Sequence, residues 1–398
     1  MKIDKIKTIN NNVPVMNEEK LEKHKIKYKQ CIRCIMDTSD SGIFFDIDGM
    51  CNHCKRFDEL LPVRVFNGEE AKIRLEKLVA KIKSAGRGRD YDCIIGISGG
   101  VDSTYVAYIT KSLGLRPLAV HFDNGWNSEL AVKNIQNTLD VLNIDLYTHV
   151  VDWESFKDLQ FSFLKSSTPD GEVPTDHAIS GLLFSEASKR GIKYIISGMN
   201  FATESISIPS WAYGHSDIKY ISAVHKAFGT MTLKRYPSFS FGKLFWWTFV
   251  KRIQIVSILN YMDYSKDEAM SILNNELGWI YYGGKHYESV YTRFYQGYVL
   301  PKKFGIDKRR AHLSDLILSK QISREQAIDL MNLPAYDEKL FIQDYGFVLK
   351  KFNLKEEEFE EIMNSPKRNF REFPNHFAYV VFLKNFINYL RSKGLYSK

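Results

Sequence analysis

Short apolar runs alternate with longer amphipathic segments between residues 91 and 200. Short apolar runs bounded by turn residues are typical of buried strands, whereas apolar positions three or four residues apart are typical of helices. The pattern predicts strands over 93–97, 117–122, 146–151 and 194–197, with helices over 103–113, 128–142 and 177–189. Strands that alternate with helices form a parallel sheet with crossover helices. We therefore predict a doubly wound, mostly parallel α/β domain over residues 90–234.

The chain on either side of this domain has a different pattern. Residues 1–27 are polar and rich in Lys, Asn and Glu, which predicts an N-terminal arm. Residues 63–89 carry apolar positions near helical spacing and predict a linker helix. Residues 235–398 are aromatic and Lys-rich with mainly helical spacing, and they predict a mostly helical region that completes a substrate pocket.

The most apolar stretch of the chain lies between residues 239 and 261. Lys243, Lys251 and Arg252 interrupt it, so we expect a buried or interfacial helix rather than contact with a membrane. No run approaches the roughly 20 apolar residues that a membrane-spanning helix needs, and the first residues are charged. These features predict a cytoplasmic protein.

Composition and charge narrow the function only slightly. The 398 residues, 44% of them hydrophobic, supply ample apolar material for a core. The formal net charge of +8 suits a nucleic acid, a nucleotide or nucleotide-sugar substrate, or simply a solvated basic surface. Because much of the excess is divided between residues 20–29 and 302–310, charge alone does not choose among them.

Residues 98–103 (Ser-Gly-Gly-Val-Asp-Ser) follow the first predicted strand and precede the first predicted helix. A tight turn there directs backbone N–H groups and a helix N-terminus at one point, an arrangement that binds phosphate. Gly99 and Gly100 permit close approach of the main chain, and the hydroxyls of Ser98, Ser103 and Thr104 can add donors. The chain lacks the Gly-x-x-x-x-Gly-Lys-Ser/Thr loop. A plain turn is the alternative.

Four of the five cysteines fall in two Cys-x-x-Cys pairs separated by sixteen residues: Cys31, Cys34, Cys51 and Cys54. This spacing predicts a zinc ribbon over residues 28–62, with a structural role because four thiolates leave no open coordination position. An iron–sulfur cluster also fits four cysteines. A redox pair would lie beside a βαβ unit, and both pairs lie outside the predicted one.

Two residues near these pairs need separate interpretation. His53 lies inside the second pair, and we expect it beside the metal site or at the surface rather than on the metal. Cys93 lies in the first predicted strand, where a small buried core residue is expected rather than a nucleophile.

The 98–103 loop resembles that of the PP-loop ATP pyrophosphatase superfamily, which splits ATP into AMP and pyrophosphate. The resemblance implies that an oxygen of the substrate is adenylated. Residues 121–125 and 197–204 end later strands, at the carboxyl edge where α/β sheets bind ligands. The superfamily places adenosine contacts at the first of these and an acidic Mg²⁺ ligand at the second. The residues thereby expected at the nucleotide are Ser98, Gly99, Gly100, Val101, Asp102, Ser103, Thr104, His121, Phe122, Asp123, Gly198 and Asn200.

Glu204 is the candidate Mg²⁺ ligand, with Asp102 or Asp123 as co-ligand. One or two carboxylates suffice, because Mg²⁺ keeps waters and phosphate oxygens in its shell. A turn-forming role before Asn-Gly is the alternative for Asp123.

A narrower resemblance rests on five features together: the paired cysteines, the 98–105 loop, Phe-Asp-Asn-Gly-Trp at 122–126, Ser-Gly-Met-Asn at 197–200, and Gly-Gly-Lys-His-Tyr-Glu-Ser at 283–289. From about residue 28 onward the chain resembles the N-acetyl sugar amidotransferase family of bacterial surface-polysaccharide pathways, lipopolysaccharide among them. The resemblance implies adenylation of an acetamido oxygen of a sugar or nucleotide sugar. Ammonia then adds and AMP departs, which leaves an acetamidino group.

The same resemblance implies catalytic roles for Asp102 and Ser103 in the loop and for Lys285, His286 and Glu288 beyond it. Lys285 would bind pyrophosphate or an acidic sugar, His286 would move the ammonia proton, and Glu288 would orient either. A solvated surface role is the alternative for these last three.

The chain has no recognisable glutaminase domain, so a separate glutaminase, with a cyclase-like subunit as in histidine biosynthesis, is the expected ammonia source. The runner-up function is a PP-loop tRNA-modifying enzyme, thiolating or amidating. With no evident cysteine pair left to carry sulfur, nitrogen transfer is the better hypothesis, and nucleic acid is not the expected partner. A non-catalytic zinc-ribbon scaffold is the third hypothesis.

Overall fold

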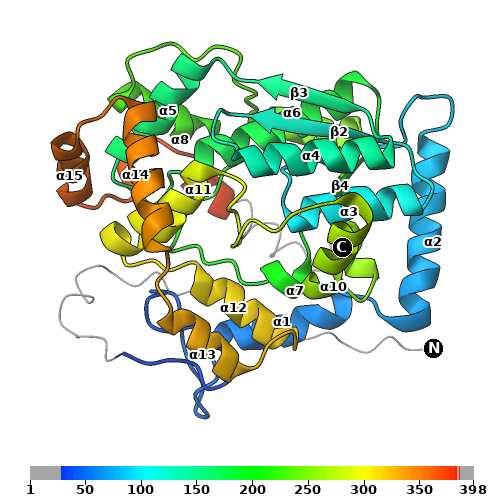
Figure 1. The fold of residues 1–398 in the computed structure, drawn as a ribbon, viewed down its shortest axis with the longest axis horizontal. Helices are drawn as coiled ribbons and strands as arrows, with labels where there is room; N and C mark the ends of the chain where they lie inside the picture. Colours follow the sequence, from blue (N-terminus) through cyan, green and yellow to red (C-terminus); the bar gives the residue numbers. More distant parts are fainter. Residues whose placement is uncertain (1–27, 383–384, 386–398) are drawn as a thin grey trace.

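The computed structural model describes residues 28–382 and 385. Its centre is a five-stranded sheet in the order β3-β2-β1-β4-β5, and every neighbouring pair is parallel (Figure 1). The strands are β1 (Cys93–Gly96), β2 (Pro117–Asp123), β3 (Leu146–Val150), β4 (Tyr194–Ser197) and β5 (Gln254–Ser257). The predicted doubly wound α/β fold is confirmed.

The sheet is covered on both faces, and β1 shows how. Its alternate residues enter different cores, since side chains of a strand point to opposite faces. Ile94 belongs to the core with Leu182 of α6 (Val173–Lys189), while Ile95 belongs to the core with Val106 of α3 (Val101–Ser112). The other helices of this domain are α4 (Glu129–Leu142) and α5 (Trp153–Lys165).

The strand order reverses between β1 and β4. The strands β2 and β3 lie on one side of β1, and β4 and β5 lie on the other side. In open α/β sheets, ligands bind at this point, outside the carboxyl ends of the strands. The loop after β1 and the turn after β4 therefore meet at the expected binding edge.

The fifth strand was not predicted. Residues 239–261 were expected to form one helix, but the structure divides them into α9 (Phe241–Phe245), the π-helical η2 (Trp246–Val250), β5 and the 3-10 turn η3 (Ile258–Tyr261). The strand itself has only four residues, too few for periodicity to separate strand from helix. Consequently the sheet extends into the region that was expected to be mostly helical.

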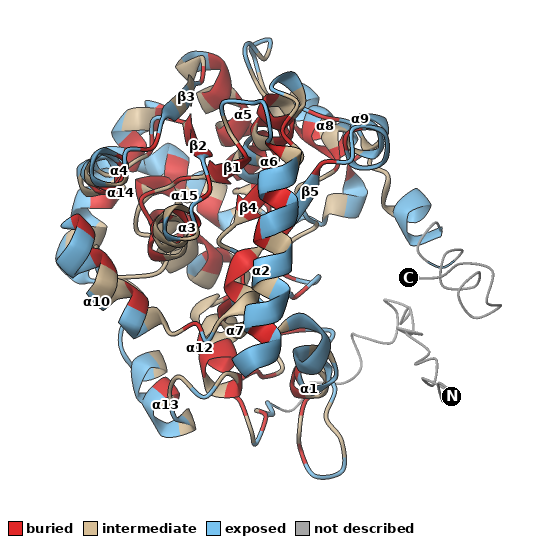
Figure 2. Cartoon of the chain, turned by 90° about the vertical axis from the view of Figure 1, so that its right-hand side faces the viewer, coloured by how far each residue is buried: buried red, intermediate tan, exposed pale blue. Residues whose placement is uncertain are grey.

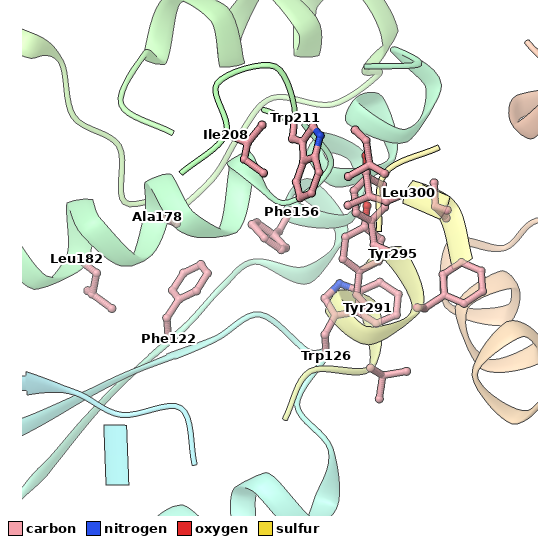
Figure 3. Packing of buried hydrophobic residues seen from close by; sticks show 14 of the residues in the cluster. Phe122, Trp126, Phe156, Ala178, Leu182, Ile208, Trp211, Tyr291, Tyr295 and Leu300 are labelled. Carbon is pink, nitrogen blue, oxygen red and sulfur yellow. The ribbon is translucent and has the colours of Figure 1, made fainter. Parts of the chain in front are cut away.

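Beyond β5 the expectation of helices is confirmed. The remaining helices are α7 (Phe201–Glu204) and α8 (Ile218–Phe228) before that strand, and α10 (Lys266–Leu277), α11 (Val290–Phe294), η4 (Tyr295–Phe304), α12 (Arg309–Leu318), α13 (Arg324–Asn332), α14 (Glu338–Phe352), α15 (Glu356–Asn364) and η5 (Phe370–Glu372) after it. Figure 3 shows Trp126, which follows β2, packed beside Tyr291 and Tyr295. One core thus joins the sheet to the helical region.

The cysteine module precedes α1 (Asn52–Arg64) and α2 (Gly68–Ala85). The predicted linker helix corresponds to α2, whose Val79 and Ile82 join the core on the α3 side of the sheet. The predicted N-terminal arm, residues 1–27, lies outside the described residues.

The cysteine module docks on the C-terminal region (Figure 1). Arg310 at the start of α12 pairs with Asp37 at 3.0 Å, and Ser314 Oγ accepts a hydrogen bond from Ile35 N at 3.2 Å. Arg324 of α13 donates to the carbonyl oxygens of Cys31 and Cys34. The module therefore supports α12 and α13 directly.

Candidate active site

The loop between β1 and α3 has the geometry expected of a phosphate site. Gly100 is the N-cap of α3, so the first N–H groups of this helix open at the carboxyl edge of the sheet. Gly99 has φ +82°, and a Cβ there would lie 2.5 Å from the carbonyl oxygen of Ala131. Only glycine fits at this position.

The serine hydroxyls of the loop bond to one another. Ser98 Oγ and Ser103 Oγ are 3.1 Å apart, and Ser103 Oγ donates to the Gly100 carbonyl at 3.1 Å. They fix the shape of the loop. Thr104 is fully buried, and its hydroxyl has no hydrogen-bond partner within the described chain.

A segment from the C-terminal region, residues 279–288, closes over this loop. Trp279 Nε1 donates to the Gly99 carbonyl at 2.9 Å, and Val101 N donates to the Tyr282 hydroxyl at 3.2 Å. Glu288 Oε1 lies 3.4 Å from the position that a Cβ on Gly100 would take. We call residues 279–288 the strap. Sequence reasoning singled out Glu288 but missed both aromatic residues, which no motif marked.

Asp102 lies where α3 meets the turn after β4. The Tyr264 hydroxyl donates to its carboxylate, and a Cβ on Gly198 would lie 3.1 Å from the Asp102 carbonyl carbon. Burial raises the pKa of Asp102, and the nearby charge of Glu204 adds to the rise. Two predicted Mg²⁺ ligands are therefore neighbours, and a divalent cation between them would offset their repulsion.

Glu204 is positioned by the capping of α7. Asn200 is the N-cap, and its side chain accepts hydrogen bonds from Thr203 N at 2.9 Å and Thr203 Oγ1 at 3.1 Å. The Asn200 side chain thus orders the turn that carries Glu204. Lys285 of the strap reaches Glu204 with an Nζ–Oε1 distance of 3.1 Å, so the structure brings these two predicted site residues together.

His286 and Glu288 also lie together, with 3.6 Å between His286 Nδ1 and Glu288 Oε1. His286 has φ +64°, an uncommon backbone conformation for histidine that turns the strap. Burial lowers the pKa of His286, but the attraction of the neighbouring Glu288 carboxylate outweighs it and the net shift is upward. Glu288 Oε2 is buried without a partner within the described chain. The pair is suited to proton transfer.

Cationic and imidazole groups that the sequence did not single out surround the same place. His312 Nδ1 lies 3.5 Å from Lys285 Nζ. Burial, then Lys285 and Lys266, lower the pKa of His312 well below its ordinary value. Burial also lowers the pKa of Lys266, against the attraction of Asp102. Lys266 and Lys285 therefore supply positive charge beside the carboxylates, and His312 is a neutral imidazole next to them.

A second group of charges lies on the α6 side of His286. Lys308 Nζ pairs with Glu172 Oε2 at 2.8 Å. Asp176 is solvent-exposed, yet surrounding protein is close enough that desolvation raises its pKa, with Glu172 adding to the rise. The charge of His286 acts in the opposite direction on the pKa of Asp176, so the two side chains lie near each other.

The residues that end β2 have local structural partners. His121 Nδ1 donates to the Ile97 carbonyl at 2.8 Å, and its Nε2 accepts from Asn127 at 3.0 Å. Phe122 packs edge-on against Phe156 in the core. Asp123 Oδ1 accepts from Gly125 N at 2.9 Å, which is the turn-forming role considered as the alternative to metal binding.

The four predicted zinc ligands converge. Their sulfur atoms all lie within 4.8 Å of one another, with separations of 3.7, 3.7 and 3.6 Å for three of the pairs. Four thiolates around one Zn²⁺ at about 2.3 Å would be about 3.8 Å apart. Met36 N and Cys51 N donate to the sulfurs of Cys34 and Cys31. This cage fits a single tetrahedral ion, whereas several irons and sulfides would need a wider one.

His53 and Cys93 lie apart from this chemistry. His53 is buried and bonds Asp40 Oδ2 at 2.8 Å, and Asp40 in turn accepts from Ser210 at 2.8 Å. Cys93 is buried, and burial raises the pKa of its thiol, as expected of a core residue.

The basic residues between 302 and 310 all have internal partners. Lys302 pairs with Glu360, Lys308 with Glu172, Arg309 with Asp307 and Arg310 with Asp37, and buried Lys303 donates to Ser167 and Ser365. Arg293 likewise pairs with Asp344. These basic side chains therefore stabilise contacts within the fold.

Among the described residues, no helix is long and apolar enough to cross a membrane.

Comparison with known families places the C-terminal region. Residues 288–386 match the family described as "LPS biosynthesis protein WbpG-like, C-terminal domain". A 90-residue segment, 22% of the chain, is 33% identical to 7-cyano-7-deazaguanine synthase from Nautilia profundicola and spans 39% of that relative's length.

Solved structures with similar regions include three proteins. NMN synthetase from Francisella tularensis covers 57% of this chain and 93% of its own, with 14% identity and a TM-score of 0.29. NH3-dependent NAD synthetase from Campylobacter jejuni covers 75% and 99%, with 12% identity and a TM-score of 0.29. A predicted subunit of tRNA methyltransferase from Methanocaldococcus jannaschii covers 46% and 75%, with 14% identity and a TM-score of 0.28.

Proposed function

We propose that this chain is an ATP-dependent amidotransferase of surface-polysaccharide synthesis, because residues 288–386 match the WbpG-like C-terminal domain of LPS biosynthesis proteins. It converts an acetamido group of a sugar or nucleotide sugar into an acetamidino group and releases AMP and pyrophosphate. The observation that carries the proposal is the contact of the strap with the β1–α3 loop, made by Trp279 and Tyr282. That contact puts proton-handling groups at the edge of a phosphate site.

In the first step the acetamido oxygen attacks the α-phosphorus of ATP, and the bond to pyrophosphate breaks. The N–H groups at the start of α3 hold phosphate oxygens. Lys285 and Lys266 offset the negative charge of pyrophosphate as it leaves. When bound by Asp102 and Glu204, Mg²⁺ supplies further charge neutralisation on the phosphates.

In the second step ammonia adds to the activated carbon. The C–O bond then breaks, AMP leaves with the electron pair, and one proton of the added nitrogen goes to a base. His286 is the proposed base, and Glu288 stabilises the imidazolium that forms. Ammonia comes from a separate glutaminase, because Cys93 is buried inside β1 and is not available as a glutaminase nucleophile.

The four-cysteine site holds Zn²⁺ in this proposal. Its role is structural, because all four cysteines are completely buried and the ion has no open position for a substrate. It supports α12, which carries His312 to the site.

The test supplies purified protein with ATP, Mg²⁺, ammonium and a panel of acetamido sugars and nucleotide sugars. We expect pyrophosphate to form with the sugar alone, in a single adenylation, and free AMP to form only when both the sugar and ammonium are present. The sugar product should lose the mass difference between O and NH. AMP formation stimulated by tRNA and indifferent to every acetamido sugar would contradict the proposal and favour a tRNA-modifying enzyme.

A further inference from the structure

The surface around α9 and η2 combines exposed aromatic side chains with cations. Phe245 is 59% exposed and Phe249 61% exposed, and their rings are in tilted contact with centroids 4.7 Å apart. Trp246 and Val250 are also about half exposed, whereas Trp247 alone is buried, against Phe184. We call Lys243, Phe245, Trp246, Phe249, Val250, Lys251 and Arg252 the basic-aromatic patch.

The charged side chains around the patch are all positive along the chain. Residues 218–262 contain seven Lys and Arg and no Asp or Glu, and all seven cations are exposed. The nearest carboxylates on packed elements are engaged: Asp158 binds His225 of α8, and Asp217 binds His376. The patch therefore attracts anions without competition from acids of its own segment.

The patch extends over neighbouring elements. Figure 2 shows α8, α9 and β5 together at one side of the molecule. Lys219 and Lys226 on α8 are exposed, and so is Ile255 on β5, the edge strand of the sheet. Phe241 contacts His376 at 5.6 Å between ring centroids. Tyr379 and Val380, a short distance further along the chain, are exposed as well.

The sequence favoured a buried or interfacial helix over membrane contact for residues 239–261, but the exposure of these side chains points the other way, and we infer that the basic-aromatic patch docks the protein on the surface of an anionic phospholipid bilayer. The ten residues of α9 and η2 run continuously, about 15 Å of helix, long enough to lie in the headgroup layer and too short to cross it. Phenyl, indole and isopropyl groups enter the interface while Lys and Arg contact lipid phosphates.

Other occupants fit less well. A symmetric dimer through this patch would bring the cations Lys243, Lys251 and Arg252 of both copies into one interface, because each side of a two-fold interface presents the same surface. Nucleic acid would meet the cations, but Val250 and the aliphatic Ile255 offer nothing to bases or phosphates. The inference is independent of which reaction the active site performs.

The experiment measures co-sedimentation of the full chain with phosphatidylcholine vesicles that contain or lack phosphatidylglycerol, together with Trp fluorescence. We expect binding only to the anionic vesicles, with a blue shift that disappears in Trp246→Phe. Because each surface cation near an anionic bilayer contributes about a fivefold factor in partitioning, Lys243→Glu with Lys251→Glu should weaken binding at least tenfold. Phe245→Ser with Phe249→Ser should abolish it.

Matched controls lie on α14, at the opposite side of the view in Figure 2. Ile342 is 64% exposed and Lys339 is exposed. Ile342→Ser removes an exposed apolar side chain and Lys339→Glu reverses an exposed charge, both away from the patch, so they should leave vesicle binding unchanged. Equal binding to neutral and anionic vesicles would overturn the inference, as would wild-type binding by the patch variants. Loss of a concentration-dependent dimer in those variants, with no vesicle binding by wild type, would identify the patch as a protein interface instead.

Discussion

Val101 donates its backbone N–H to the hydroxyl of Tyr282 at 3.2 Å, although the two residues are 181 positions apart in the sequence. This N–H is the first of α3 and belongs to the group that a phosphate would need. If this loop binds the ATP phosphates as proposed, the strap occupies part of that site, and ATP would displace the hydroxyl or share the N–H with it.

Tyr282→Phe tests this competition. A neutral hydrogen bond contributes about 0.5–1.5 kcal/mol, so its removal should lower the KM for ATP by about two- to tenfold. The measurement is AMP formation across an ATP series. Tyr281→Phe, one residue earlier and half exposed, is the control. A higher KM in Tyr282→Phe would instead make the hydroxyl a ligand of ATP.

Gly99→Ala should disrupt the loop. The new Cβ would lie 2.5 Å from the Ala131 carbonyl oxygen at a φ of +82°, so either the loop or α4 must move. We expect loss of AMP formation and destabilisation of at least about 2 kcal/mol, measured by urea unfolding.

Gly88→Ala is the matched control for that change. Gly88 has φ +75°, and a Cβ there would have nothing within 4 Å. The substitution should cost only the backbone strain of about 1 kcal/mol and retain activity. Equal behaviour of the two variants would show that close approach at Gly99 is not what the loop requires.

Asp102→Asn and Ser103→Ala should each abolish AMP release and leave the metal content of the cysteine site unchanged.

Glu204 lies close enough to Asp102 for its charge to raise the pKa of Asp102. Because both carboxylates are proposed Mg²⁺ ligands, Glu204→Gln should raise the Mg²⁺ concentration needed for half-maximal AMP formation. Glu268→Gln on exposed α10 surface is the control. An unchanged Mg²⁺ requirement in Glu204→Gln would remove this residue from the metal site.

An element of the fold could be predicted from the sequence only where its sequence pattern was long enough. The β1–loop–α3 unit was predicted because a six-residue motif follows an apolar run and precedes a helix. The fifth strand was missed because four residues, Gln254–Ser257, are too few to show a period of two. Tertiary contact with Lys193 and β4, not local pattern, makes it a strand.

The residues of the candidate site were likewise predictable only where a local sequence motif marked them. Lys285 and Glu204 were both named from the sequence, and the structure brings them within 3.1 Å. Trp279, Lys266 and His312 were not named, because they reach the loop through folding of distant helices and belong to no local motif. Asn200 was assigned to the nucleotide; its side chain caps α7, and its contact with the nucleotide stays a prediction. A capping Asn and a ligand-binding Asn look alike in sequence.

Removal of the metal should affect the active site as well as stability. Cys51→Ser with Cys54→Ser deletes two of four thiolates, and the module then loses its hold on α12, where Arg310 pairs with Asp37. We expect loss of bound zinc by elemental analysis, a lower Tm and reduced AMP formation. Cys93→Ala, outside the thiolate cage, should keep its zinc. Full activity without zinc would mean that α12 holds its position unaided.

The pH dependence of amidination tests the His286–Glu288 pair. The net effect of burial and Glu288 is to raise the pKa of His286, and the proposed base must be neutral to accept a proton. Activity should therefore fall as pH drops through a value above the ordinary 6.5 of histidine, when free ammonia is held constant by adjusting total ammonium. Glu288→Gln removes the charge that stabilises the imidazolium, so it should move this acidic limb to lower pH.

His286→Gln should remove the limb altogether. Adenylation of the sugar should persist in this variant, which is measured as pyrophosphate release in the absence of ammonia. An acidic limb that stays in place in both variants would assign the base to another residue, and Asp176, which lies near His286, would be the next to test.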